Sequence, residues 1–314
     1  MIVSVLLIVL ATLAGSTTSV HYRIVPVNAT SLCKGYPNGT CFTLKQLSSE
    51  INATGNRNIT ISFLPREHLL DWKMSFVTSE MNTMSKTHNG LINTVTLNSE
   101  QLDNTSSNPV KIMCTLPNAG ISAAGLHTFT VQGLMIYGCK RDTYGGAISV
   151  TGGNVFITET HFINNHVMSE YNEGSGGAIY LSNANVMILN SVFTNNTAFA
   201  MTLIGNVNSM SCKFKHFSVF GGGAINLLTS NVLIHGCDFD SNRAKCGGAL
   251  IINSLGSHTN ISNTTFRGNY AEQGGAIYNY NVRIPTNIVG TSFINNSASS
   301  GGAIFTLAQL QSKD

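Results

Sequence analysis

The stretch Phe266-Arg267-Gly268-Asn269, followed by Gly274-Gly275-Ala276-Ile277, decides the fold of this chain. Its second half recurs, as Gly-Gly-Ala-Ile or Gly-Gly-Ala-Leu, six times in the last 170 residues. Because a unit of about 25 residues is too short for a globular domain, it indicates one coil of a solenoid, which buries its apolar face by stacking on copies of itself. The six copies are Gly145–Ile148, Gly176–Ile179, Gly222–Ile225, Gly247–Leu250, Gly274–Ile277 and Gly301–Ile304.

A phenylalanine stands eight residues before four of these glycine pairs, and Tyr137 takes the same slot before the first. The glycine pairs that begin at Gly176 and Gly222 are 46 residues apart. Between them, eight residues after Phe193, the segment Met201-Thr202-Leu203-Ile204 takes the place of the glycine motif as a degenerate copy, so the interval divides into two coils. The glycine pairs that begin at Gly145 and Gly176 are 31 residues apart, and this interval contains a six-residue insertion between Asn165 and Gly176. The register therefore predicts seven coils, beginning at residues 145, 176, 201, 222, 247, 274 and 301.

Aligning the coils on phenylalanine brings like residues into columns. β-Branched residues alternate with a period of two before each phenylalanine, which is typical of strands. Asparagine recurs three residues after it; an asparagine tolerates the left-handed region, and its amide can bond the asparagine of the next coil. The pattern predicts an all-β fold, a parallel β-helix. The two columns are Ile157, Ile188, Ile234, Ile261 and Ile288, and Asn165, Asn196, Asn242, Asn269 and Asn296.

The recurring Phe-x-x-Asn and Gly-Gly-Ala-Ile pair resembles the repeats of polymorphic outer membrane proteins. It is similar, too, to secreted eukaryotic proteins with a β-helix of the pectin-lyase type. The resemblance covers about residues 110–314 and implies a right-handed parallel β-helix and, in the bacterial family, adhesion to cells. The copies of Phe-x-x-Asn are Phe162–Asn165, Phe193–Asn196, Phe239–Asn242, Phe266–Asn269 and Phe293–Asn296.

The chain divides into three regions. Residues 1–20 carry an apolar run too short to span a bilayer, followed by small residues, and we interpret them as a secretory signal peptide. Residues 21–109 are expected to form an N-terminal cap with early irregular coils, including a short amphipathic helix at residues 41–50 over the open end of the solenoid. Residues 110–314 hold the repeats and are expected to be truncated at the C-terminus, since residues 301–306 open a coil shortly before Asp314. No later segment has eighteen consecutive apolar residues, so we predict a secreted, extracellular chain without a transmembrane segment.

Asn-x-Ser/Thr sequons occur nine times and are candidate glycosylation sites in a secretory context. Asn195 and Asn295 lie beside the asparagine column, and we expect structural roles for them. The candidate glycosylation sites are Asn28, Asn38, Asn52, Asn58, Asn104, Asn260 and Asn263.

Seven cysteines fit an oxidising compartment and leave one cysteine unpaired. Cys33 and Cys41 flank a short loop that a disulfide could close. Two other pairs, Cys114 with Cys139 and Cys212 with Cys237, are each 25 residues apart, which is one coil. Strands stack at about 4.7–4.9 Å, a separation that a disulfide accepts, so disulfides and stacked free thiols remain alternatives for both pairs. Cys246 is then the odd cysteine.

Charged residues make up 10% of the chain, the formal net charge is +3, and the sequence has no basic run for nucleic acid. The pectin-lyase resemblance implies action on polysaccharides, for which lyases need clustered acids and a base, and hydrolases need paired carboxylates. The best cluster flanks Phe239: Asp238 and Asp240 face outward, with Lys215 and Arg267 expected on the neighbouring coils. A surface ion-pair ladder is the simpler interpretation of the same residues.

The histidines share no column, so we expect no metal site, and nothing in the sequence indicates a cofactor. The six-residue insertion is a candidate binding loop, with a plain surface excursion as the alternative. Three functions stay open. We favour a secreted or cell-surface β-helix with a structural or adhesive role, binding glycans or proteins through its lateral faces, over a polysaccharide-degrading lyase or hydrolase and over a fragment of a larger extracellular receptor-like protein. The loop candidates are His166, Glu170, Tyr171 and Glu173.

Overall fold

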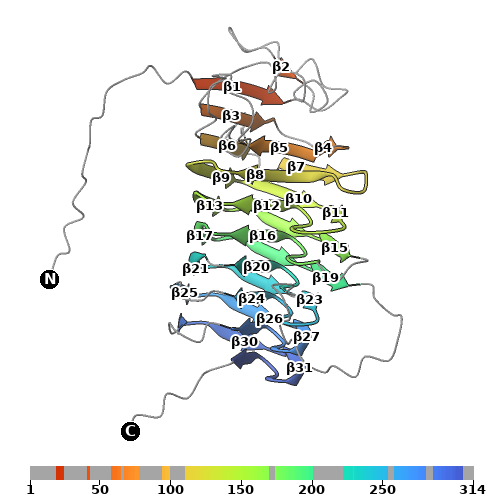
Figure 1. Ribbon diagram of the computed structural model, residues 1–314, viewed down its shortest axis with the longest axis vertical. Helices are drawn as coiled ribbons and strands as arrows, with labels where there is room; N and C mark the ends of the chain where they lie inside the picture. The colour runs from red at the N-terminus through yellow and green to blue at the C-terminus, as the bar shows by residue number, and fades with distance from the viewer. Residues whose placement is uncertain are drawn as a thin grey trace, which may run out of the picture.

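The computed structural model describes residues 19–24, 41–42, 58–64, 67–71, 73–77, 94–99, 110–169, 174–200, 222–228, 230–253, 258–280 and 286–306. These residues contain strands β1 to β32 and no helix. All the strand pairs are parallel and form four sheets, named A to D below. The strands are stacked along the long axis, from β2 and β1 at one end to β31 at the other (Figure 1).

From β8 onward, each complete coil contributes one strand to each sheet. Sheet A consists, in spatial order, of β2 (Cys41–Phe42), β1 (Ser19–Ile24), β3 (Asn58–Phe63), β6 (Thr94–Ser99), β9 (Thr128–Gln132), β13 (Asn154–Thr158), β17 (Asn185–Leu189), β21 (Asn231–His235), β25 (Thr259–Ser262) and β29 (Asn287–Val289). Sheet B consists of β4 (Glu67–Leu70), β7 (Val110–Cys114), β10 (Leu134–Tyr137), β14 (His161–Ile163), β18 (Val192–Thr194), β22 (Asp238–Asp240), β26 (Thr265–Arg267) and β30 (Ser292–Ile294). Sheet C consists of β5 (Lys73–Val77), β8 (Gly120–Ala124), β12 (Ile148–Thr151), β16 (Ile179–Ser182), β20 (Ile225–Leu228), β24 (Leu250–Asn253), β28 (Ile277–Asn279) and β32 (Ile304–Thr306). Sheet D consists of β11 (Lys140–Arg141), β15 (His166–Ser169), β19 (Thr197–Ala200), β23 (Arg243–Ala244), β27 (Tyr270–Gln273) and β31 (Ser297–Ser300).

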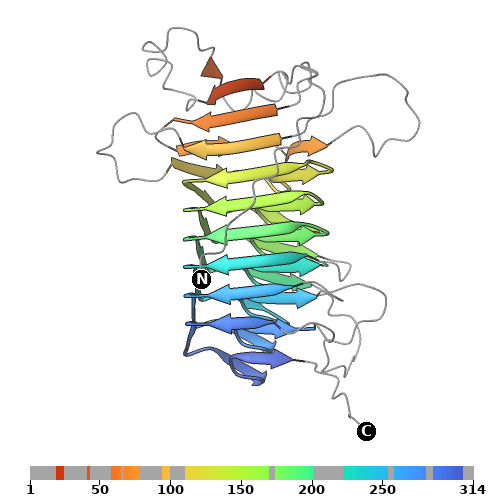
Figure 2. The ribbon, with the colours of Figure 1, turned by 90° about the vertical axis from the view of Figure 1, so that its left-hand side faces the viewer.

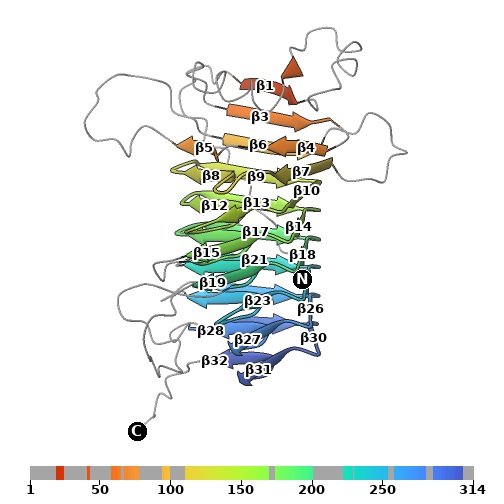
Figure 3. The same cartoon turned by 90° about the vertical axis from the view of Figure 1, so that its right-hand side faces the viewer.

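One coil contains one strand from each sheet in the order C, A, B and D, as β12 to β15 show. Figure 2 shows the strands lying across the long axis, and Figure 3 shows β13, β17 and β21 one below another. The predicted right-handed parallel β-helix is therefore confirmed. Sheet C has eight strands, and seven of them follow residue 110: six lie at the predicted glycine motifs, and the seventh does not.

The glycine pair that defines the repeat solves a packing problem between coils. Its first glycine takes a left-handed backbone, with φ of 59° at Gly247. At the second, a Cβ on Gly248 would collide with the carbonyl oxygen of Gly275 in the next coil. A Cβ on Gly247 would likewise collide with the carbonyl oxygen of Leu250, and both obstacles are backbone atoms, which no rotamer change can move. The motif is therefore a requirement of close stacking at this corner.

The core consists of columns of identical residues. Phe162, Phe193, Phe239, Phe266 and Phe293 stack face to face, with ring centroids 5.0, 4.8, 4.7 and 5.1 Å apart. The isoleucine column runs beside them, and Ile157, Ile188 and Ile234 are fully buried. Burying a large apolar side chain contributes about 1.5–3 kcal/mol, so these columns are the main source of stability for each coil.

The predicted asparagine column is a buried hydrogen-bond ladder, which we call the inner ladder. The Nδ2 atom of Asn165 donates to Oδ1 of Asn196 at 3.1 Å, and Nδ2 of Asn196 donates to Oδ1 of Asn242 at 3.1 Å. Each Oδ1 also accepts the backbone N–H of the preceding asparagine, at 3.0 Å for Asn165 and 2.9 Å for Asn196. Every coil is thus tied to the next at the corner between sheets B and D.

The structure corrects the coil predicted at residues 201–204. Strand β17 pairs directly with β21, and β18 pairs with β22, so that Phe193 is the register partner of Phe239. The degenerate copy is therefore not a coil of the stack, and residues 201–221 lie outside the described residues. The physical reason is that the corner of a coil accepts only glycine, and Met201 and Thr202, which would have to occupy it, both carry a Cβ atom. The seventh coil is the one that contains β8.

The phenylalanine slot before Gly145 is also corrected. Strands β10 and β14 pair so that Ile136, and not Tyr137, is the register partner of Phe162. Tyr137 pairs with Ile163 on the outward side, because an additional residue separates this slot from the glycine pair.

The N-terminal region shares the sheets of the repeats. Strand β3 adds to sheet A, while β5 and β6 extend sheets C and A through the region expected to be irregular. Cys41 and Phe42 form strand β2 and pair with Arg23 and Ile24 of β1, so these two residues are not part of a helix, contrary to the prediction. Pairing with a neighbouring strand outweighs local helical spacing there. Residues 43–50, the rest of that prediction, lie outside the described residues, as do residues 1–18 of the predicted signal peptide.

Candidate functional site

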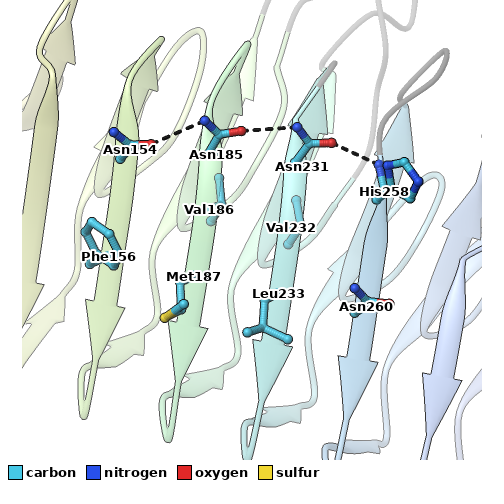
Figure 4. A pocket seen from close by; sticks show the side chains of 10 residues that line it. All are labelled: Asn154, Phe156, Asn185, Val186, Met187, Asn231, Val232, Leu233, His258 and Asn260. Carbon is cyan, nitrogen blue, oxygen red and sulfur yellow. Dashed lines mark hydrogen bonds between the residues drawn. The ribbon is translucent and has the colours of Figure 1, made fainter. Parts of the chain in front are cut away.

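A shallow groove of about 270 Å³ crosses the outward face of sheet A. It spans four coils and is formed by β13, β17 and β21 and by the residues at and just before β25 (Figure 4). Its residues come from two outward columns of the sheet, with two inward valines, Val186 and Val232, beneath them. Because strands stack at about 4.7–4.9 Å, the same chemical groups recur at that spacing along the groove.

The first column is an exposed ladder of side-chain amides, which we call the outer ladder. Asn185 donates from Nδ2 to Oδ1 of Asn154 at 3.2 Å, and Asn231 donates to Oδ1 of Asn185 at 3.1 Å. At one end of the ladder, Nδ2 of Asn154 donates to the carbonyl oxygen of His127 at 3.1 Å. At the other end, the backbone N–H of His258 donates to Oδ1 of Asn231 at 3.0 Å. Each amide uses one of its two N–H groups in the ladder, so the second can serve a ligand.

The second column is an apolar stripe, made by Phe156, Met187 and Leu233. These side chains are half-buried although they point outward from the sheet, and Figure 4 shows them in a row beside the ladder. Asn260 continues the row after Leu233. An apolar row beside a row of amides offers a ligand apolar contact along one side and hydrogen-bonding groups along the other, the two kinds of contact that small-molecule sites combine.

The groove lining has no Asp, Glu, Lys or Arg. Sugars have C–H groups on their ring faces and hydroxyls at their edges, which match the apolar stripe and the amide ladder respectively. The arrangement therefore suits a neutral, extended, hydroxyl-rich chain that runs along the axis of the β-helix.

The predicted acidic cluster is only partly assembled. Asp240 pairs in register with Arg267 on one side, as predicted, but with Thr194 on the other. The predicted position of Lys215 beside Asp240 is therefore wrong, and Lys215 lies outside the described residues. Asp238 is exposed between Val192 and Thr265, while Asp240 is half-buried and accepts a hydrogen bond from Oγ of Ser241 at 2.7 Å. Within the described ranges no three His, Cys, Asp or Glu side chains gather around a common point.

The candidate binding loop is described at one residue only. His166 begins β15, between Lys140 and Thr197 in register, and burial lowers its pKa, with the charge of Lys140 acting in the same direction. Glu170, Tyr171 and Glu173 lie outside the described residues, so the loop stays a prediction.

The sequons differ in what surrounds them. Asn260 and Asn263 are exposed, whereas Asn58 is half-buried with its Oδ1 atom buried and unpartnered. Asn195 takes a left-handed backbone with φ of 53° and donates from Nδ2 to Oδ1 of Asn164 at 2.7 Å, which agrees with the structural role expected for it. The candidates Asn28, Asn38, Asn52 and Asn104 lie outside the described residues.

The cysteines confirm one pairing and correct another. Cys114 and Cys139 form a disulfide with Cα atoms 4.7 Å apart, so for this pair the disulfide, and not a pair of stacked free thiols, is the correct alternative. The Cys212–Cys237 pairing is wrong, because Cys237 is a buried free thiol with Ser191 and Thr264 at the corresponding positions of the coils above and below. Cys246 is not the odd cysteine, since it is engaged in a disulfide. Cys33 lies outside the described residues, so its pairing with Cys41 stays a prediction.

A buried cation, missed from the sequence, closes the N-terminal end of sheet D. Arg141 is 7% exposed and occupies the inward column that Val167, Ala198 and Ala244 fill in later coils. It donates to the carbonyl oxygen of Tyr144 at 3.3 Å and to Oγ of Ser122 at 3.2 Å, and its Nε has no partner. Burial lowers its pKa to about 10, opposed by the charge of Asp142. It has a structural role as a plug at this end of the sheet.

Sequence reasoning also missed the groove, although a signal for it exists. Asparagine stands eight residues before Phe162, Phe193 and Phe239, so the alignment that revealed the inner ladder contains the outer one. The apolar stripe has no such signature, because Phe156, Met187 and Leu233 differ in residue type. Only the sheet register shows that they form one row.

Two segments, residues 263–280 and 290–307, match the family model of the Chlamydia polymorphic membrane protein (Chlamydia_PMP) repeat. Each segment contains one Phe-x-x-Asn and one Gly-Gly-Ala-Ile motif. The predicted resemblance is thereby confirmed: the chain carries repeats of polymorphic membrane protein type, folded as a β-helix. No curated protein matches the chain. A search of the described residues finds no helix long and apolar enough to cross a membrane.

Proposed function

We propose that this chain is a secreted or surface-exposed β-helix that binds neutral glycans through the groove on sheet A. The observation that carries the proposal is the apolar stripe of Phe156, Met187 and Leu233 beside the outer ladder. The repeat type supports a surface location, as do the Cys114–Cys139 disulfide and the disulfide of Cys246, because disulfides persist in oxidising compartments.

A neutral ligand is favoured over an acidic one for an electrostatic reason. A polyuronate needs cations spaced along its path, and the groove lining has no Lys or Arg. The unused amide N–H groups of the outer ladder are neutral donors, which suit hydroxyl oxygens. Because the groups repeat from coil to coil, a polymer can engage several of them at once, which raises avidity above that of a single sugar.

The first experiment is a glycan array probed with the secreted chain, followed by titration of the best ligand. We expect extended neutral glycans to bind and Met187→Ala to weaken binding about tenfold, which corresponds to the loss of about 1.4 kcal/mol of contact. Met168→Ala is the matched control, since Met168 is an exposed methionine on sheet D, away from the groove. Equal losses from both variants, or binding to protein partners alone, would contradict the proposal.

The same preparation also tests the enzymatic alternative, which the adjacent Asp240 and Arg267 keep open. Polyuronate and neutral polysaccharides are incubated with the chain, and new reducing or unsaturated ends are measured. We expect no cleavage. Cleavage that disappears with Asp240→Ala would replace the binding function with a catalytic one.

A further inference from the structure

Asn260 lies at the C-terminal end of the apolar stripe. Its register partners are Leu233 in the coil above and Asn287 in the coil below, so its side chain points outward in the same column as the stripe. The residue is exposed, and its carboxamide makes no hydrogen bond to any of the described residues. It is thus the groove amide that is not held in the outer ladder.

Asn260 also differs from the ladder asparagines in sequence. Two residues after Asn154, Asn185 and Asn231 come the stripe residues themselves, so none of these three asparagines begins a sequon. Two residues after Asn260 comes Ser262, which completes the sequon Asn260-Ile261-Ser262. The only glycosylation signal among the asparagines that line the groove therefore stands at its end, on an exposed and unbonded amide.

We propose that Asn260 is an N-glycosylation site and that its glycan lies along the apolar stripe and closes the groove, a regulation of the site that rests on the proposed function. The donor is an oligosaccharide linked to a lipid diphosphate. In the transfer a bond forms between Nδ2 of Asn260 and C1 of the first sugar, the bond from C1 to the diphosphate breaks, the amide nitrogen loses one proton, and the lipid diphosphate leaves.

The geometry favours contact between such a glycan and the stripe. Leu233 lies one strand spacing from Asn260 and Met187 lies two, so the first sugars reach both along the column. A tethered ligand has an effective concentration in the millimolar range, so even a weak contact between a sugar face and the stripe is well populated. The glycan would then compete directly with any free ligand.

The neighbouring sequon at Asn263 provides a control within the same chain. Asn263 stands at the corner between β25 and β26 with φ of 49°, and it is exposed. It lies outside the groove lining, so its glycan would project from the corner. Thr265→Val removes this sequon, keeps a β-branched residue in β26, and leaves the groove unchanged.

The test uses the full chain secreted from mammalian cells, as wild type and as Ser262→Ala, Ser262→Thr and Thr265→Val. Mass spectrometry of glycopeptides measures occupancy at Asn260. Groove accessibility is measured as the rate of sulfoxide formation at Met187 with dilute peroxide, with Met168, which is 43% exposed, as the internal reference. Where Ser262→Ala is not secreted, native wild-type protein treated with a peptide N-glycosidase takes its place.

We expect Asn260 to be occupied in the wild type, Ser262→Thr and Thr265→Val proteins and empty in Ser262→Ala. Oxidation of Met187 should be roughly threefold or more faster in Ser262→Ala or after glycan removal, while Met168 reacts at one rate throughout. An unmodified Asn260, or equal Met187 rates with and without the glycan, overturns the inference. Neither readout uses a ligand, so a failed glycan array with a protected Met187 rejects the proposed function alone.

Discussion

The chain builds two asparagine ladders on the same coils: the inner ladder is buried at the corner between sheets B and D, and the outer ladder lies on the outward face of sheet A. Asn165, Asn196 and Asn242 of the inner ladder are fully buried, and each side chain is bonded to backbone and to the next asparagine. In the outer ladder, Asn185 and Asn231 are exposed; they bond to each other, and each makes one further ladder bond, Asn185 to Asn154 and Asn231 to the backbone N–H of His258. An unpaired buried amide costs far more than an exposed one, because water satisfies the exposed group. The comparison teaches that one residue type serves folding where it is buried and leaves donors available for a ligand where it is exposed.

The largest effect is expected where a coil touches its neighbour through backbone. Gly248→Ala should destabilise the chain by more than about 4 kcal/mol, because its Cβ meets the carbonyl oxygen of Gly275. Gly268→Asn is the matched control: Gly268 has φ of 60°, and asparagines hold the same corner at Asn164, Asn195 and Asn295. Thermal unfolding followed by circular dichroism measures both. A folded, stable Gly248→Ala protein would show that the coils are less tightly stacked than described.

The next comparison removes one phenylalanine from each side of the sheets. Phe239→Ala, in the middle of the buried stack, should cost about 3–5 kcal/mol of unfolding free energy. Phe156→Ala, in the groove, should cost less than about 1 kcal/mol while it weakens glycan binding. Chemical denaturation gives both values. Equal destabilisation would mean that the apolar stripe belongs to the core and is not a binding surface.

Matched alanine substitutions test the two ladders directly. Asn196→Ala leaves the backbone N–H of Asn165 and the carbonyl oxygen of Phe162 without their side-chain partner, and we expect a loss of about 3 kcal/mol. Asn185→Ala removes an exposed rung, and we expect a loss below about 1 kcal/mol together with weaker ligand binding. The difference in thermal midpoint between the two variants is the measurement. Equal decreases in thermal midpoint for the two variants would remove the distinction between the ladders.

The smallest effect concerns the inward thiol of Cys237. Burial raises its pKa to about 11 from the ordinary 9.0. The unfolded chain therefore releases the proton near pH 9 while the folded chain retains it, so this group's contribution to stability is present below about pH 9 and is lost as the pH rises to about 11. Cys237→Ser should lose less stability than the wild type over that window, and serine suits the column because Ser191 and Thr264 occupy it. Thermal midpoints of both proteins across the window test the sign.

Much of the fold could be predicted from the repeat. The phenylalanine, isoleucine and inner asparagine columns follow from spacing within a coil, since each coil of a solenoid meets the same neighbours. Of the candidate site residues, the pairing of Asp240 with Arg267 and the Cys114–Cys139 disulfide followed from the same register. The position of Lys215 and the pairing of Cys237 failed for one shared reason, the assumption that residues 201–221 form a coil.

By itself, the sequence determined the coil: its strands, its glycine corners and the residues that stack inside it, because these depend on local spacing repeated along the chain. Only the tertiary structure decided which coils are neighbours. The coil of Gly177 stacks on the coil of Gly223, because the backbones of these two glycines are in contact although they are 46 residues apart, and counting residues from Phe193 did not predict this. The tertiary structure likewise decided the groove, because Phe156, Met187 and Leu233 become one surface only when three strands align. Pairing between strands is non-local, and its register is settled by packing.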